Sequence, residues 1–216
     1  MTVLADEILS LLPLRLAATT VCIDRSQRRI VTDVSFDVAG GQMLAVTGPN
    51  GAGKSTLLRA LAGLLPLSAG TVTCSGLPGE TTLAGHAHYL GHRDALKSAL
   101  TARENLAFWA AMLAQPGAGG LSPEAALARL ALPQVADFPV SYLSAGQKRR
   151  VALARLLVAH RPVWLLDEPT TALDAASQYI VAGMIEAHLA SGGIVIAATH
   201  MGLGVAGARE LRLGGP

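Results

Sequence analysis

The stretch "GPNGAGKS" at residues 48–55 decides the fold of this chain. It follows a short apolar run and precedes a segment with helical spacing, and a glycine-rich turn between a strand and a helix is typical of a phosphate-binding loop. Its glycines let backbone N–H groups converge on phosphate oxygens, and the following helix adds its positive end. The predicted nucleotide-binding loop consists of Gly48, Pro49, Asn50, Gly51, Ala52, Gly53, Lys54, Ser55 and Thr56.

The polar side chains at the end of this loop have distinct predicted roles. Lys54 is expected to reach the β and γ phosphates, and Ser55 is expected to bind Mg²⁺. Thr56 is placed for a contact nearer the α phosphate. The helix is expected to continue through Leu57, Leu58, Leu61 and Leu64.

Two later segments supply the predicted catalytic groups. "VWLLDEP" at residues 163–169 is an apolar strand that ends in two acids. Asp167 is placed to hold Mg²⁺ or its waters, and Glu168 could orient and deprotonate an attacking water. "IVIAATH" at residues 194–200 ends in His200, whose imidazole could touch the γ phosphate and hold that water in line. The alternatives are that the acids only cap the next element and that His200 is a satisfied surface group.

These strands define an α/β fold with a P-loop NTPase core. Apolar strands that end in polar residues favour a parallel sheet with its ligand crevice at the carboxyl ends of the strands. The residues before Gly48 and the stretch "GTVTCSG" at 70–76 suggest a small antiparallel β subdomain. Residues of about 93–142 suggest a mostly helical insert, which a capping box at Thr101 and Glu104 opens.

Composition limits the remaining possibilities. The chain has 216 residues, 51% of them hydrophobic, and its net charge of +2 comes from 17 basic against 15 acidic residues. The near balance of charge argues against nucleic-acid binding. Cys22 and Cys74 form no disulfide or zinc pattern and fit small buried residues in a reducing compartment. Residues 1–13 are expected to form an N-terminal extension. No apolar run is long enough to span a bilayer, so work on a membrane requires partner chains.

The stretch "LSAGQ" at residues 143–147 has two possible roles. Ser144 and Gln147 fit a capping box at the start of a helix. Gly146 weakens the first turn of that helix, and a glycine is expected there if another backbone or a phosphate approaches too closely for a Cβ. Because a helix N-terminus with a serine hydroxyl can bind an anion, and the chain's own loop already holds one phosphate chain, the second phosphate should belong to another subunit.

Four motifs in series then carry a family resemblance. In their order and spacing they are similar to the ATP-binding subunits of ABC transporters, over nearly the whole chain. The resemblance implies an ABC-type ATP-binding domain over residues 14–216 and two subunits that sandwich two ATP molecules. Ser144 and Gly146 of one subunit would then face the γ phosphate held by the other, with Asp174 at the interface. The motifs are "GPNGAGKST", "LSAGQKRR", "LLDEPTTALD" and "ATH".

The closer resemblance is to the haem exporter ATP-binding subunits of bacterial cytochrome c maturation. It rests on "LSAGQKRRVALARL" and on "YLGHRDALKSALTARENLAFWAAML" at residues 89–113. Most ABC subunits have a glutamine at the place of His92, in a loop that senses the γ phosphate through Mg²⁺ and contacts membrane subunits. His92 is therefore counted with the cofactor-binding residues, although imidazole is a poor Mg²⁺ ligand.

The resemblance implies ATP-driven haem export or release of a haem-loaded chaperone. The expected partners are a second ATP-binding subunit, multispanning membrane subunits and, indirectly, the haem chaperone, with no nucleic acid. The expected location is peripheral, on the cytoplasmic face of the inner membrane. Two alternatives remain open: an ABC transporter ATPase for another substrate, and a non-transport ABC ATPase that acts as a switch on nucleic acid or ribosomes.

Three features depart from the common pattern or stay unassigned. Ala145 replaces the first glycine of the commoner "LSGGQ". No aromatic residue stands near Arg25, where the adenine ring is usually stacked, so Arg25 itself is the candidate for base stacking through its guanidinium plane. The spacing of His86 and His88 places them on one face of a strand, where a haem or metal site is an alternative to a structural role.

Overall fold

The computed structural model describes residues 13–77, 82–115, 119–200 and 202–214. The chain forms two compact units. The first contains residues up to 89, residues 162–168 and residues from 185 onward, and the second contains residues 90–161 and 169–184. Most of the predicted N-terminal extension lies outside the described residues.

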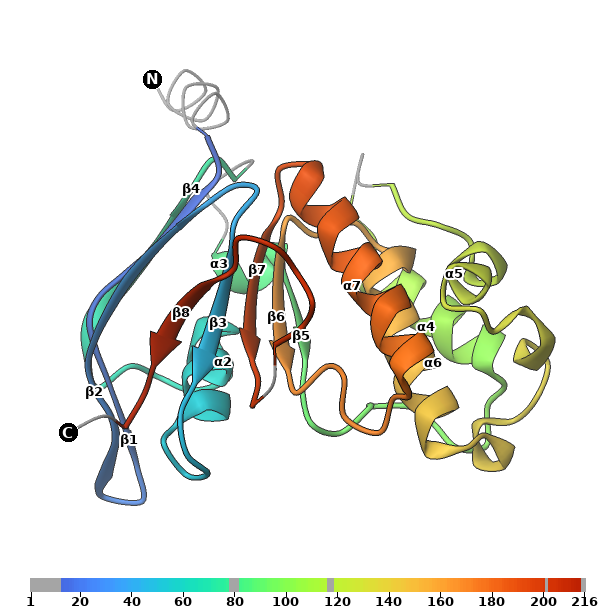
Figure 1. The fold of residues 1–216 in the computed structure, drawn as a ribbon, viewed down its shortest axis with the longest axis horizontal. Coiled ribbons are helices and arrows are strands. Elements are labelled where there is room, and N and C mark those ends of the chain that lie inside the picture. The colour runs from blue at the N-terminus through green and yellow to red at the C-terminus, as the bar shows by residue number, and fades with distance from the viewer. Residues whose placement is uncertain (1–12, 78–81, 116–118, 201, 215–216) are drawn as a thin grey trace. The chain divides into compact units, whose positions relative to one another are not determined.

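The first unit contains the predicted antiparallel sheet. Its strands are β1 (Arg15–Arg25), β2 (Arg28–Ala39) and β4 (Ala69–Ser75), in the order β2-β1-β4. Both pairings of β1 are antiparallel, and Figure 1 shows the three strands side by side. Ser26 and Gln27 connect β1 to β2 with positive φ angles of 49° and 64°. A two-residue turn of that kind matches the twist of the strands it joins.

The same unit contains a five-stranded sheet in the order β5-β6-β7-β3-β8. The neighbours β6 and β7, β7 and β3, and β3 and β8 are parallel. Every residue of β6 and β7 is buried, which explains their uninterrupted apolar sequences. The strands are β5 (Ala87–Leu90), β6 (Val163–Asp167), β7 (Ile194–Ala198), β3 (Met43–Thr47) and β8 (Arg209–Arg212).

Helix α2 (Lys54–Leu61) follows the glycine-rich loop, as predicted, and packs into the core shared by both sheets. Leu57, Leu58 and Leu61 are buried in that core. The expectation for Leu64 was wrong, since this side chain is 61% exposed beyond the end of the helix. Gly63 takes a left-handed φ of 72°, which ends the helix before Leu64 can join its buried face. A short helix α3 (Leu83–His86) leads into β5.

The second unit is formed mainly by helices, with α4, α5 and α6 packed against one another. Residues 91–101 contain no helix, so this part of the stretch from about 93 to 142 is less helical than predicted. Helix α7 begins in this unit and ends in the first. The elements are α4 (Ala102–Leu113), α5 (Pro123–Arg129), the 3₁₀ turns η1 (Pro133–Val135) and η2 (Val140–Tyr142), α6 (Ala145–Val158) and α7 (Ala175–Ala190).

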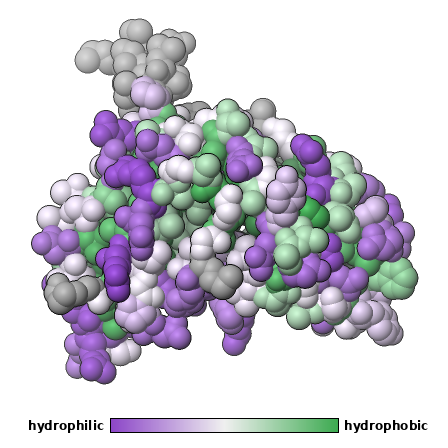
Figure 2. Space-filling model, viewed as in Figure 1, coloured by the Kyte–Doolittle hydropathy of each residue, from purple (hydrophilic) through white to green (hydrophobic). Residues whose placement is uncertain are grey.

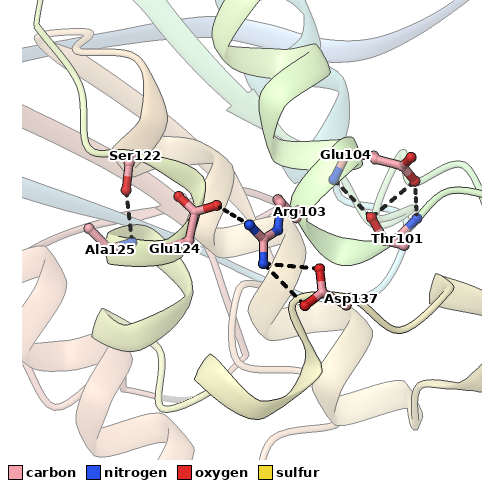
Figure 3. Close-up of polar contacts among 7 residues, drawn as sticks. All are labelled: Thr101, Arg103, Glu104, Ser122, Glu124, Ala125 and Asp137. Atoms are coloured by element: carbon pink, nitrogen blue, oxygen red, sulfur yellow. Dashed lines mark hydrogen bonds and ion pairs between the residues drawn. The ribbon is translucent and has the colours of Figure 1, made fainter.

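Side-chain caps and an ion-pair cluster fix the ends of these helices. Thr101 and Glu104 form the predicted capping box of α4, and Ser122 caps α5 through the N–H of Ala125. Arg103 contacts both Glu124 and Asp137 at 3.0 Å. Figure 3 shows that this guanidinium joins three separate segments of the unit.

Within the described ranges, the helices are each too short or too polar to span a bilayer. On the face shown in Figure 2, hydrophilic and hydrophobic residues are interspersed. The large apolar side chains that remain exposed are mostly in the second unit and include Phe108, Met112, Phe138, Tyr142 and Tyr179.

Candidate functional site

The glycine-rich loop has a backbone that other residues could not adopt. Gly48 has a φ of 134°, and a Cβ added there would lie 2.3 Å from the carbonyl oxygen of Leu213. Gly53 is the left-handed N-cap of α2, with a φ of 96°, and a Cβ there would lie 2.9 Å from Val31. The loop therefore packs closely on β2 and on the end of β8, while Pro49, Asn50 and Gly51 at its tip are exposed.

Lys54 is the first residue of helix α2, and its side chain folds back onto the glycine-rich loop. Its ammonium donates hydrogen bonds to the carbonyl oxygens of Gly48, at 2.7 Å, and Pro49, at 3.1 Å. The side chain is buried. Both of these acceptors are neutral carbonyl oxygens. The ammonium can exchange them for charged phosphate oxygens, which form stronger hydrogen bonds.

Ser55 and Asp167 lie together, as their predicted shared role requires. The Ser55 hydroxyl donates to Oδ1 of Asp167 at 2.9 Å. Asp167 is the last residue of β6 and is only 2% exposed. A hydroxyl and a carboxylate are hard oxygen donors of the kind that Mg²⁺ prefers, so the two residues fit this ion. Anywhere in the described part of the chain, this site included, no group of three or more His, Cys, Asp or Glu residues could hold a metal ion.

Glu168 and His200 also lie together. Nε2 of His200 is 3.2 Å from Oε1 of Glu168, with the imidazole about half exposed and the carboxylate less so. The backbone N–H of Glu168 donates to the carbonyl of Ala198 at 2.9 Å, which fixes the end of β6 beside the end of β7. Glu168 has a φ of 49°. A non-glycine residue in that region carries strain, and such residues concentrate at functional sites.

The described first unit offers no exposed aromatic residue for base stacking. Phe36 and Tyr89 pack against the core, and Trp164 is buried and stacked on His188 with the ring centroids 3.9 Å apart. Arg25 is exposed at the end of β1. Its stacking on adenine stays a prediction.

Ser144 and Gln147 form the predicted capping box of α6. The hydroxyl of Ser144 accepts from the N–H of Gln147 at 3.2 Å, and the side chain of Gln147 accepts from the N–H of Ser144 at 2.8 Å. A Cβ on Gly146 would lie 3.0 Å from the carbonyl oxygen of Ala172. A backbone of the same unit therefore approaches Gly146 closely, which was one of the two explanations for this glycine. Ser144 itself is exposed.

Asp174 caps helix α7. Its Oδ1 accepts from the N–H of Ser177 at 2.8 Å. Hydrogen bonds from the hydroxyl and then the backbone of Ser177 lower the pKa of the Asp174 carboxyl below its usual value. The side chain is exposed, so this structural role leaves its outer surface accessible.

His92 is exposed in the loop between β5 and α4. Sequence reasoning missed the residue that anchors this loop. Arg149 of α6 is buried and bonds the carbonyl of Gly91 and the carboxylate of Asp94. Nothing in "KRR" distinguishes the buried arginine from its neighbours, because the direction of a side chain on a helix depends on what packs against it.

The predictions for the histidine pair and for Cys74 were wrong. His86 is the last residue of α3, and only His88 lies in strand β5, so they do not form one strand face. Both side chains are buried. Cys22 is buried as predicted, but Cys74 is only partly buried. Burial still raises the pKa of the Cys74 thiol to about 11.

The predicted site residues divide between the two units. The loop from Gly48 to Thr56 belongs to the first unit, together with Asp167, Glu168 and His200. His92, Ser144, Gly146, Gln147 and Asp174 belong to the second unit. Each unit therefore carries part of the predicted set, with the larger part in the first unit.

Comparison with known protein families matches residues 31–171 to the ABC transporter family. Among solved structures, a putative ABC transporter ATP-binding protein from Pyrococcus furiosus superposes with a TM-score of 0.78 at 22% identity, covering 92% of this chain and 97% of the other. A bacterial Atm1-family ABC exporter with ATP bound gives 0.76 at 28% identity, covering 93% of this chain and 37% of the exporter chain. The first likeness bears on the fold alone.

Closer relatives share about half of the sequence over almost their full length. Each is a cytochrome c biogenesis ATP-binding export protein, CcmA. The protein of Nitrobacter winogradskyi is 52% identical over 94% of this chain and 99% of its own length. Those of Bradyrhizobium diazoefficiens and Rhizobium meliloti are both 50% identical, over 90% and 94% of this chain and 95% and 99% of their own lengths.

Proposed function

The chain belongs to the ABC transporter ATP-binding proteins, in the CcmA family of cytochrome c biogenesis export proteins, and from this we propose that its ATP hydrolysis drives haem export or the release of a haem-loaded chaperone. It is an ABC transporter ATPase. The observation that best supports the catalytic assignment is the meeting of Ser55 with Asp167 beside a loop that can receive phosphates.

The loop residues bind and orient the triphosphate. Backbone N–H groups of the loop and the N-terminus of α2 face its negative charge. Lys54 leaves the carbonyls of Gly48 and Pro49 to bond the β and γ phosphates. Ser55 and Asp167 would hold Mg²⁺, which neutralises charge on the β and γ oxygens when it is bound.

Glu168 and His200 act on the attacking water. The water oxygen forms a bond to the γ phosphorus while the bond from that phosphorus to the bridging oxygen of ADP breaks. Glu168 accepts the proton that the water loses, and the products are ADP and inorganic phosphate. His200 keeps Glu168 and the water in line, which its 3.2 Å approach to the carboxylate supports.

A second copy of the chain completes each site. The N-terminus of α6, with Ser144, Gly146 and Gln147, lends its positive end to the γ phosphate held by the partner. Asp174 lies at that interface. The exposure of Ser144 and Asp174 supports this role. Binding of two shared ATP molecules closes the pair and hydrolysis reopens it, which converts phosphate chemistry into motion.

That motion would pass to multispanning membrane subunits at the cytoplasmic face of the inner membrane. The haem chaperone is an indirect partner. The identity of about 50% to CcmA proteins over nearly the full chain favours cytochrome c maturation over transport of another substrate or a role on nucleic acid.

The Glu168→Gln variant tests the catalytic assignment. It should lower ATP turnover by about 100-fold or more, because the amide cannot accept the proton. ATP should still bind, and the ATP-bound dimer should accumulate, as light scattering would show. A variant with normal turnover would reject Glu168 as the base.

Affinity purification from membranes tests the biological assignment. The full-length chain should bring down multispanning subunits and a haem-containing partner that is visible by absorbance spectroscopy. Recovery of unrelated permeases, or of ribosomes, would instead support one of the two alternatives.

A further inference from the structure

Arg149 is a buried charge that bonds three segments of the second unit. It lies in α6, five residues after the Ser144 cap, and is 4% exposed. Its Nε donates to the carbonyl of Pro169 at 3.2 Å. Its Nη1 donates to the carbonyl of Gly91 at 3.0 Å and to Oδ1 of Asp94 at 2.9 Å. One side chain thus joins α6, the loop after β5 and the residue that follows Glu168.

The two contacts in the loop lie on either side of exposed residues. His92 and Arg93 are both exposed, between Gly91 and Asp94. The far end of the loop is held separately by Asn105 of α4, which bonds the N–H and the carbonyl of Lys97. Because residues 91–101 contain no helix, these side chains set the path of the loop.

Burial makes this arrangement costly unless each donor has a partner. A buried guanidinium loses its hydration, which costs free energy. For this reason, replacing a buried ion pair with apolar residues of similar volume often does not lower the stability of a protein. A second arginine of α6, Arg155, is also buried and stacks over Trp109 at 4.4 Å. Burial and the nearby charge of Arg149 lower its pKa to about 10. Fold stability alone is a weak reason to keep two buried cations so close together.

We propose that Arg149 is a positioning residue that couples the N-terminal end of α6 to the His92 loop and to the backbone following Glu168. When Ser144 meets the partner's γ phosphate, a shift of α6 carries Gly91 and Asp94 with it and so reorients His92 and Arg93. This inference rests on the proposed function, since it needs a phosphate to engage α6. It gives the His92 loop a mechanical link to nucleotide that does not depend on imidazole binding Mg²⁺.

The variants Arg149→Lys and Asp94→Asn test the link in the full-length protein. A single ammonium cannot reproduce the planar set of bonds to three acceptors. We expect Arg149→Lys to lower kcat about tenfold, with KM for ATP within about threefold, because the loop that binds the triphosphate belongs to the first unit. Asp94→Asn should act in the same direction. The double variant should be no worse than the more severe single one, since both changes break one link.

Hydrogen exchange gives a readout that a purely structural role would not change. In the Glu168→Gln background, ATP should slow exchange of the amides at residues 91–96. With Arg149→Lys added, ATP should bind with unchanged affinity but no longer slow that exchange. If Arg149→Lys does not fold, the same measurement on Asp94→Asn decides, because that variant keeps the bonds of Arg149 to Gly91 and Pro169.

Arg103→Lys is the matched control. Arg103 also joins three segments of this unit, through Glu124 and Asp137, and neither of these two partners belongs to the His92 loop. Its kcat should stay within about twofold of the parent. Three outcomes would overturn the inference. The kcat could fall equally in Arg149→Lys and Arg103→Lys, the effects of Arg149→Lys and Asp94→Asn could add, or the turnover of Arg149→Lys could be unchanged. An inactive parent protein would instead refute the proposed function.

Discussion

The substitution Asp167→Asn should raise the stability of the protein without Mg²⁺ and nucleotide, and it should reduce the further stabilisation that these ligands bring. Asp167 is 2% exposed and accepts a hydrogen bond from Ser55 at 2.9 Å. The amide oxygen of asparagine can accept the same bond in nearly the same volume. The substitution therefore removes a buried negative charge, while the hydrogen bond from Ser55 can be kept.

The size of the effect without nucleotide follows from two terms. Burying an ionised group costs several kcal/mol after relaxation of the protein. Replacing a charged acceptor with a neutral one loses about 1 kcal/mol of hydrogen-bond energy. We expect a net gain of about 2 kcal/mol in the free energy of unfolding, which raises the Tm of a chain this long by about 4–8 °C.

Mg²⁺ and nucleotide should stabilise the variant less than the parent, because the proposed role of the buried charge is to bind Mg²⁺. At a ligand concentration of about 100 times Kd, binding stabilises the parent by about 2.7 kcal/mol. If the loss of the carboxylate raises Kd about tenfold, the same concentration stabilises the variant by only about 1.4 kcal/mol. The ligand-induced increase in stability should therefore be about halved.

Thermal unfolding in EDTA, and then with Mg²⁺ and a non-hydrolysable ATP analogue, measures both changes. Asp137→Asn is the control for loss of one carboxylate at the surface, since the Asp137 side chain is 78% exposed. It should change either value by less than about 0.5 kcal/mol. A lower Tm of Asp167→Asn in EDTA, or an undiminished ligand-induced shift, would refute the assignment of Asp167.

Ser144→Asp should keep the Tm within about 1 °C, because aspartate caps a helix as well as serine, yet its negative charge at the γ phosphate should abolish ATP turnover; active enzyme would contradict the contact with the partner's nucleotide. For Cys74, burial raises the thiol pKa from 9.0 to about 11, so its alkylation in the folded protein should still accelerate above pH 9. Since the folded thiol holds its proton more tightly than the unfolded one, its contribution to stability is complete below pH 9 and is lost as the pH rises toward 11. Urea unfolding of the parent and Cys74→Ser across this range checks the sign, and a pH dependence that the substitution leaves unchanged would exclude the thiol as its cause.

Local signals in the sequence were sufficient for the two strands that carry the predicted catalytic residues and for several helix starts. "VWLLDEP" and "IVIAATH" are apolar runs that end in acids and in histidine, and they form β6 and β7 with those residues at or beyond the carboxyl ends. The capping boxes at Thr101 and Ser144 also form as predicted. Each of these signals depends on residues close together in the chain, which a sequence displays directly.

Other features failed because a neighbouring residue or helix interrupts the pattern, or because residues distant in the chain decide the local structure. Leu64 fits a helical spacing, but the left-handed Gly63 ends α2 first. His86 and His88 fit an alternating strand, but α3 extends to His86. Residues 93–101 fall within the predicted helical insert of about 93–142, yet the bonds of Arg149 and Asn105 hold them as an irregular loop. Arg149 comes from a helix more than fifty positions away, so no local pattern could show that link.

The order of residues by itself determined the phosphate loop and the two acids at the carboxyl end of β6, since a glycine-rich turn and an apolar strand are local choices of the backbone. The folded chain decided that Ser55 lies 2.9 Å from Asp167 and that His200 lies 3.2 Å from Glu168. Those distances exist because parallel pairing of β6 with β7 and packing of α2 bring together residues that are separated along the chain. Such pairing depends on burying apolar strands between partners, which only the completed core provides.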